Sequence, residues 1–159
     1  MSGIDEYRFR SVLSRFASGV TIVTAVDSEG ADHGITVSAF CSLSLDPPLV
    51  LVCIDHETEM HRILSTSPAF AVNVLAVDQE ELARKFSDPD NDRFDGTSFA
   101  RGTNGAALLT GVAAHLQCAL VQSFEGGDHT VYVGRVEAAE ASDAQPLLYY
   151  RGGYARLER

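Results

Sequence analysis

The sequence predicts a mainly β protein with flanking helices, folded as a small closed or nearly closed antiparallel barrel. Six or seven short runs have the alternating or β-branched pattern of strands, and hairpin turns join most of them. The 159 residues show no repeat, linker or change of composition, and 45% of them are hydrophobic. We therefore expect a single domain, residues 1–159, that can bury a complete core.

The first part of the chain predicts a helix followed by a β-hairpin. Between Asp5 and Ala17 the apolar residues recur at helical spacing, which predicts an amphipathic helix laid on the core. Ser18 and Gly19 should end this helix. The β-branched run from Val20 to Val26 predicts a strand, and the turn residues 27–30 lead into a second strand that begins near His33.

The middle of the chain predicts strands that alternate with short helices. The stretch from Leu49 to Ile54 is apolar at consecutive positions, which predicts a strand covered on both faces, at a barrel wall or a subunit interface. A short helical pattern around Met60 follows. Pro68 introduces a strand over residues 70–75, and Asp78 should cap a helix that ends near residue 87.

The last third predicts a loop and a long hairpin. Residues 88–105 are rich in Asp, Asn, Gly and Ser, and so long a loop in a small domain is typical of a mobile lid, here over the Asp92–Gly96 segment. Strand-like runs at 112–124 and 129–139 flank Gly126 and Gly127, which suit a tight hairpin turn. A final strand should cover residues 147–150.

Charge and cysteine content restrict the possible partners. The chain has 12 basic and 22 acidic residues and a formal net charge of −10, which argues against non-specific binding to nucleic acid or to anionic membranes. The three cysteines are odd in number and lack C-x-x-C spacing, so reduced thiols are expected. Without a leader or a membrane-length apolar run, the sequence predicts a cytoplasmic protein.

The common catalytic motifs are absent from the sequence. His56 and His61 flank Glu57, but they are five rather than four residues apart, so we expect no zinc site on one helix face. Asp88, Asp90 and Asp92 resemble the start of a calcium loop that lacks its glycine and final glutamate. No G-x-G-x-x-G, P-loop or G-x-S-x-G pattern occurs, although a hydrolase with unmarked residues stays possible.

The stretch from Gly34 to Leu49, GITVSAFCSLSLDPPL, carries the most specific signal. Its small hydroxyl side chains would leave backbone N–H groups accessible, which suits a planar, acceptor-rich ligand or a phosphate, and Pro47 and Pro48 end the strand. The alternative is a Ser-rich edge strand that turns a corner. The stretch resembles the signature of the flavin reductase-like family, close to G-x-T-x-S-[SA]-F-x-S-x-S-x-x-P-P-L, at every defining position. Further similar segments are RFRSVLSRFASGVTIVTA, FAVNVL, LARKFS, DRFDG, GDHTVYVGRV and PLLYYRGGY, so the resemblance covers nearly the whole chain.

This resemblance implies a split β-barrel that binds flavin between the two subunits of a homodimer. It implies a reductase that oxidises NADH or NADPH, reduces FMN or FAD, and passes the reduced flavin to a separate flavin-dependent monooxygenase. Such chemistry belongs to the cofactors and needs no nucleophile. Two alternatives stay open: a non-catalytic flavin- or haem-binding carrier or sensor, and a pyridoxamine-phosphate-oxidase-like enzyme.

The resemblance also implies a set of site residues and no metal ligand. The cofactor contacts would be Thr36, Ser38, Ala39, Phe40, Cys53, Asp55, Thr58, Lys85, Phe86, Ser87 and Tyr154. His129, directly after the Gly-Gly turn, would contact the nicotinamide or the reduced flavin, unless it merely caps the turn beside Asp128. Lys85 would bind the flavin phosphate, unless it is a surface lysine at a helix C-terminus.

Overall fold

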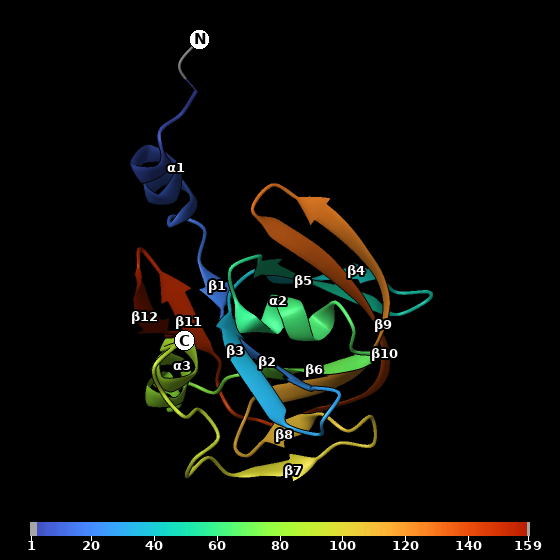
Figure 1. The fold of residues 1–159 in the computed structure, drawn as a ribbon. Coiled ribbons are helices and arrows are strands. Elements are labelled where there is room, and N and C mark those ends of the chain that lie inside the picture. The colour runs from blue at the N-terminus through green and yellow to red at the C-terminus, as the bar shows by residue number, and fades with distance from the viewer. Residues whose placement is uncertain (1–2, 159) are drawn as a thin grey trace.

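The computed structural model describes residues 3–158 and is built around one seven-stranded antiparallel sheet (Figure 1). Along the sheet the strand order is β3-β2-β6-β9-β10-β5-β4. The strands are β2 (Thr21–Val26), β3 (Asp32–Val37), β4 (Phe40–Ser44), β5 (Leu49–Asp55), β6 (Ala69–Val74), β9 (Ala114–Gly126) and β10 (His129–Ala141). The predicted mainly β, antiparallel fold class is therefore confirmed.

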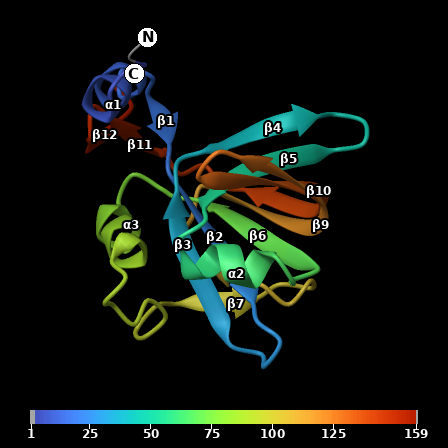
Figure 2. The ribbon, with the colours of Figure 1, turned by 45° about the horizontal axis from the view of Figure 1, so that its top comes forward.

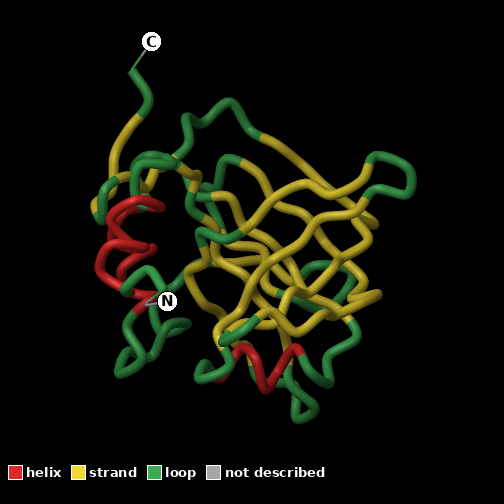
Figure 3. The backbone as a smooth tube through the Cα atoms, turned by 90° about the horizontal axis from the view of Figure 1, so that it is seen from above, coloured by secondary structure: helices red, strands yellow, loops and turns green. Residues whose placement is uncertain are grey.

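The two end strands of this sheet meet, so that the sheet closes into a barrel. β3 and β4 lie at opposite ends of the strand order, yet in the chain only Ser38 and Ala39 separate them. The Cys53 N–H of β5 donates to the Ala39 carbonyl oxygen at 3.0 Å, which joins this connection to the far side of the sheet. We call this place, residues Ser38–Ala39, the seam. Figure 3 shows the strands as a closed mesh with the helices at its outside.

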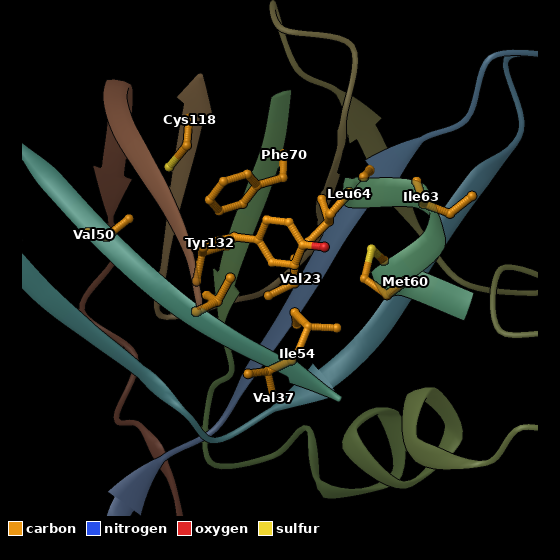
Figure 4. Close-up of a cluster of buried hydrophobic side chains, with 13 residues drawn as sticks. Val23, Val37, Val50, Ile54, Met60, Ile63, Leu64, Phe70, Cys118 and Tyr132 are labelled. Carbon is orange, nitrogen blue, oxygen red and sulfur yellow. The ribbon is translucent and has the colours of Figure 1, made fainter. Parts of the chain in front are cut away.

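The barrel interior is filled by the first of two apolar clusters (Figure 4). Helix α2 (Glu59–Leu64) contributes Met60, Ile63 and Leu64, all buried, to this cluster. Phe70 and Tyr132 face them from β6 and β10. Gly134 allows the close packing here, because a Cβ at that position would lie 2.6 Å from the Phe70 ring.

A second apolar cluster lies between the barrel and helix α3 (Glu80–Ser87). The Phe86 side chain of α3 is completely buried, and its ring meets that of Phe94 edge to face with a centroid distance of 5.2 Å. Two small sheets surround this cluster. They consist of β1 (Ser18–Gly19), β11 (Leu147–Tyr150) and β12 (Gly153–Arg156), and of β7 (Phe99–Arg101) and β8 (Ala107–Leu109).

The N-terminal helix differs from its prediction. Helix α1 covers Glu6–Leu13 and has no buried residue, and Phe9 and Phe16 are 52% and 81% exposed. The prediction of a helix laid on the core is therefore wrong for a single chain. Figures 1 and 2 show α1 standing apart from the barrel, near β11 and β12. None of the described helices is long and apolar enough to cross a membrane.

Four smaller predictions also need correction. The residue at the N-cap of α3 is Gln79 rather than Asp78, and its side chain makes no capping hydrogen bond. β5 alternates between buried residues such as Val52 and half-buried ones such as Cys53, so within a single chain it is not fully covered on both faces. The strand that begins at Asp32 breaks at Ser38 and Ala39, and the predicted loop 88–105 contains strand β7.

Candidate functional site

A cleft of about 280 Å³ opens at the seam of the barrel, and we call it the Ser38 cleft. Its lining comes from β3, the seam, the end of β5 and the start of β10. Seven of the predicted site residues meet there: Thr36, Ser38, Ala39, Cys53, Asp55, Thr58 and His129. They join because β5 pairs with β10 on one side and reaches the seam on the other.

The seam offers this cleft two adjacent backbone donors. Ser38 and Ala39 are both exposed, and their carbonyl oxygens accept hydrogen bonds from the N–H groups of Phe40 and Cys53. Within residues 3–158, by contrast, neither the Ser38 N–H nor the Ala39 N–H has an acceptor. An acceptor-rich ligand that lies against the seam can satisfy both donors without displacing a strand.

The turn after β5 forms another wall of the cleft. The Asp55 carboxylate accepts from the Glu57 N–H at 2.9 Å, and the Asp55 carbonyl accepts from the Thr58 hydroxyl at 2.8 Å. Thr58 then caps α2. Burial, and secondly the nearby Cys41, raises the pKa of the Cys53 thiol, so Cys53 is a protonated, unreactive side chain at neutral pH.

His129 lies at the mouth of the cleft and also contacts the hairpin turn. It pairs in register with Asp55 of β5, and its side chain is 40% exposed. Its Nδ1 lies 2.7 Å from Asp128 Oδ1, and this hydrogen bond lowers the pKa of the Asp128 carboxyl. The structure therefore contains both features that the sequence left as alternatives, the lining of the cleft and the contact with Asp128.

A second, larger hollow of about 510 Å³ adjoins the Ser38 cleft, and we call it the Arg93 groove. The two share Ile35 and Thr58 as lining residues. Arg93 Nη1 donates to the Gly34 carbonyl oxygen at 2.6 Å, and burial lowers the pKa of this guanidinium. Ser87 also lines this groove rather than the cleft, as do the acidic residues Asp32, Glu57, Glu59 and Asp92.

Four of the predicted cofactor contacts lie outside the lining of both hollows. Phe86 is completely buried in the second cluster. Phe40 packs against the barrel core. Lys85 Nζ donates to the Asp95 carbonyl oxygen and to the Thr97 hydroxyl. Tyr154 packs edge to face on a neighbouring tyrosine ring and lies under a guanidinium.

The loop after α3 is anchored rather than loose. Lys85 holds it through Asp95 and Thr97, Arg93 holds it through Gly34, and Phe94 packs between two aromatic rings. The sequence did not predict that Ile35 lines both hollows, and it predicted Arg93 only as part of a mobile loop. The signal for Arg93 was its neighbour Phe94, because an aromatic residue inside a polar loop indicates a segment fixed to the core.

Thr36 binds the protein itself as well as lining the cleft. Its hydroxyl donates to the Ala83 carbonyl oxygen of α3 at 2.7 Å, so the donor capacity of this side chain is used in joining β3 to α3. The barrel, the cleft at its seam and the exposed backbone donors define the class of architecture: an antiparallel split barrel with a cleft that opens at the seam.

Comparison with known proteins gives the family. The model for the flavin reductase like domain matches residues 13–158. The chain is 41% identical to the flavin-dependent monooxygenase reductase subunit HsaB of Rhodococcus jostii (strain RHA1), covering 98% of this chain and 80% of that protein. It is also 41% identical to an NADH-dependent FAD reductase of Streptomyces globisporus, covering 96% of this chain and 85% of the relative.

A solved structure agrees with both relatives. The Streptomyces globisporus C-1027 NADH:FAD oxidoreductase SgcE6, in complex with NAD and FAD fragments, superposes with a TM-score of 0.93 at 38% identity. The match covers 99% of this chain and 98% of SgcE6. The chain belongs to the flavin reductase-like domain family.

Proposed function

We propose that this protein is an NADH-dependent flavin reductase that supplies reduced flavin to a separate monooxygenase. The observation that carries the proposal is the Ser38 cleft, which seven predicted residues line beside two backbone N–H groups that have no acceptor within residues 3–158. Relatives named as reductase subunits of monooxygenases, at about 40% identity over nearly the whole chain, support the same activity.

The residues of the cleft fit a flavin. Small side chains at Ser38 and Ala39 let a flat ring approach the backbone, and the N–H groups of these residues match the acceptor atoms of a flavin pyrimidine edge. A bound flavin would supply the hydride acceptor for the nicotinamide. The protein itself would hold the flavin and nicotinamide rings together, exclude water, and offer hydrogen-bond donors where negative charge develops on the flavin.

His129 would contact the nicotinamide, and the Arg93 groove would hold the part of the flavin cofactor that extends beyond its ring. At the mouth of the cleft, the His129 ring could donate a hydrogen bond to a carboxamide oxygen of the nicotinamide. The Arg93 groove adjoins the cleft and leaves room for a ligand longer than a flavin ring. We propose FAD as the flavin and NADH as the donor, on the support of the relative that is named for both.

The decisive experiment measures the rate of NADH oxidation with added FAD, FMN or no flavin, and repeats the series with NADPH. We expect acceleration that saturates with both NADH and FAD. Tight flavin binding without acceleration would contradict the proposal and support the carrier or sensor alternative. Transfer of reduced flavin is then tested by adding a flavin-dependent monooxygenase and measuring its product.

We also propose a homodimer, in the cytoplasm, in which a second copy covers α1. Apolar side chains of α1 and its flanks are half or more exposed: Ile4, Tyr7, Phe9, Val12, Leu13 and Phe16. Burial of such a set in a dimer is favourable by about 25 cal/mol per Å² of apolar surface. Sedimentation should give a dimer that Phe9→Ser weakens and Arg8→Ser, on the same helix, does not. A monomer at all concentrations would contradict this proposal.

A further inference from the structure

The histidine that follows β5 fastens the base of the β9–β10 turn. The His56 N–H donates to the Asp128 carbonyl oxygen at 3.0 Å. On the side chain, His56 Nε2 lies 2.9 Å from the Thr130 hydroxyl and 3.0 Å from the Glu125 carboxylate. Glu125 and Thr130 are partners across the hairpin, so one imidazole contacts both strands where they enter the turn.

These contacts decide which way His129 faces. Thr130 is buried, and its hydroxyl is held by His56 on one face of β10. Successive side chains of a strand point to opposite faces, so His129 is directed to the other face, where it pairs with Asp55 and lines the Ser38 cleft. A rotation of the strand end that released Thr130 would also move His129.

The His56 ring is itself supported from the core. It lies against the His61 ring with a centroid distance of 4.8 Å. His61 Nδ1 lies 2.8 Å from the hydroxyl of Tyr132, which is buried in the barrel cluster, and Figure 4 shows that hydroxyl directed toward α2. The turn that His56 holds contains Gly127, which has a φ of +71°, and a Cβ added there would meet no atom of residues 3–158 within 4 Å beyond its chain neighbours.

We propose that His56 is a positioning residue for nicotinamide binding, acting through His129. It links the barrel core to the glycine turn and keeps the His129 ring at the mouth of the cleft. The inference rests on the proposed function, in which His129 meets the nicotinamide. The inference adds a residue on which nicotinamide binding depends although it does not touch the ligand, because His56 is not among the residues that line the cleft.

Two amide substitutions that differ in reach test this role. The His56→Gln amide nitrogen can occupy the place of Nε2 and contact Thr130 and Glu125, whereas the shorter His56→Asn amide cannot. We expect His56→Asn to lower kcat/KM for NADH by about three- to tenfold, mainly through KM, and to leave the flavin Kd unchanged. His56→Gln should stay near wild type. His115→Ala, which removes another histidine–glutamate contact far from the turn, is the control for stability alone.

A double-mutant cycle separates positioning from a general loss of structure. If His56 acts through His129, adding His56→Asn to His129→Ala should cause no further loss of kcat/KM. If the fold-losses of kcat/KM from the two single variants multiplied in the double variant, the proposal would be overturned. Equal kinetics of His56→Asn and His56→Gln would overturn it as well. The NMR signals of the His129 ring give a readout that does not depend on turnover, and they should shift in His56→Asn but not in His115→Ala. An unshifted ring refutes the positioning role, whereas an inactive wild-type protein refutes the proposed function instead.

Discussion

Substitution of Gly34 tests how closely the signature stretch packs against the second apolar cluster. Gly34 is buried on β3, and a Cβ added there would lie 2.6 Å and 2.8 Å from two ring atoms of Phe86 and 3.4 Å from Phe94. The Phe86 ring cannot swing aside, because it is completely buried and packs edge to face on Phe94. Gly34→Ala must therefore displace α3 or β3.

Overpacking of this kind costs about 1–3 kcal/mol of unfolding free energy. For a chain of this size each kcal/mol lowers Tm by about 2–4 °C, so we expect a loss of roughly 2–12 °C. Thermal unfolding followed by circular dichroism measures it. FAD affinity should fall as well, because the displaced strand carries Thr36 and leads to Ser38.

Gly19→Ala is the matched control, since nothing lies within 4 Å of a Cβ at that strand position. If Gly34→Ala and Gly19→Ala unfolded at the same temperature, the argument from ring contact would be refuted. The double variant Gly34→Ala with Phe86→Leu should recover part of the lost stability, because the smaller side chain removes the atoms that clash. Failure to recover would place the strain elsewhere.

Three further substitutions test the cleft. Ser38→Leu should raise the flavin Kd at least tenfold, about 1.4 kcal/mol, because the larger side chain blocks the seam. Ser42→Leu, on the exposed part of β4, should leave the flavin Kd unchanged. Equal flavin affinities of the two variants in titration would contradict the assignment of Ser38 to the site. His129→Ala should raise KM for NADH or lower kcat about tenfold at unchanged Tm, and a loss of Tm alone would assign His129 to its contact with Asp128. Lys85→Ala should weaken FMN, FAD and riboflavin alike, because its ammonium group holds the loop; a loss confined to FMN and FAD would show that Lys85 binds phosphate.

The sequence predicted the features that depend on local pattern. β-branched and alternating runs indicated the strands, and Gly126 and Gly127 indicated the turn between β9 and β10. The signature stretch supplies half of the residues that line the cleft, and the rest come from the end of β5, Thr58 and His129. The small side chains of Ser38 and Ala39 could be read from residue types, whereas the break in the strand at these residues could not.

Features that depend on distant packing could not be read in this way. Phe86 lies in the last turn of α3, on its apolar face, and the same pattern fits a ring that contacts a ligand or a ring buried in a core. The apolar face of α1 predicted a helix on the core, but the pattern does not say that the covering surface belongs to the same chain. His56 and His61 were judged as if on one helix, whereas α2 begins at Glu59 and the turn before it brings their rings together.

The seam has a consequence for the behaviour of the protein between turnovers. Unpaired backbone donors at the edge of a sheet are the groups through which strands of separate molecules join and aggregate. Within residues 3–158, the unpaired donors of the seam belong to Ser38 and Ala39 alone, which is too short a stretch to template a strand. In the proposed function, each release of reduced flavin would re-expose only these two donors, so the empty seam would give a second chain no edge on which to add a strand.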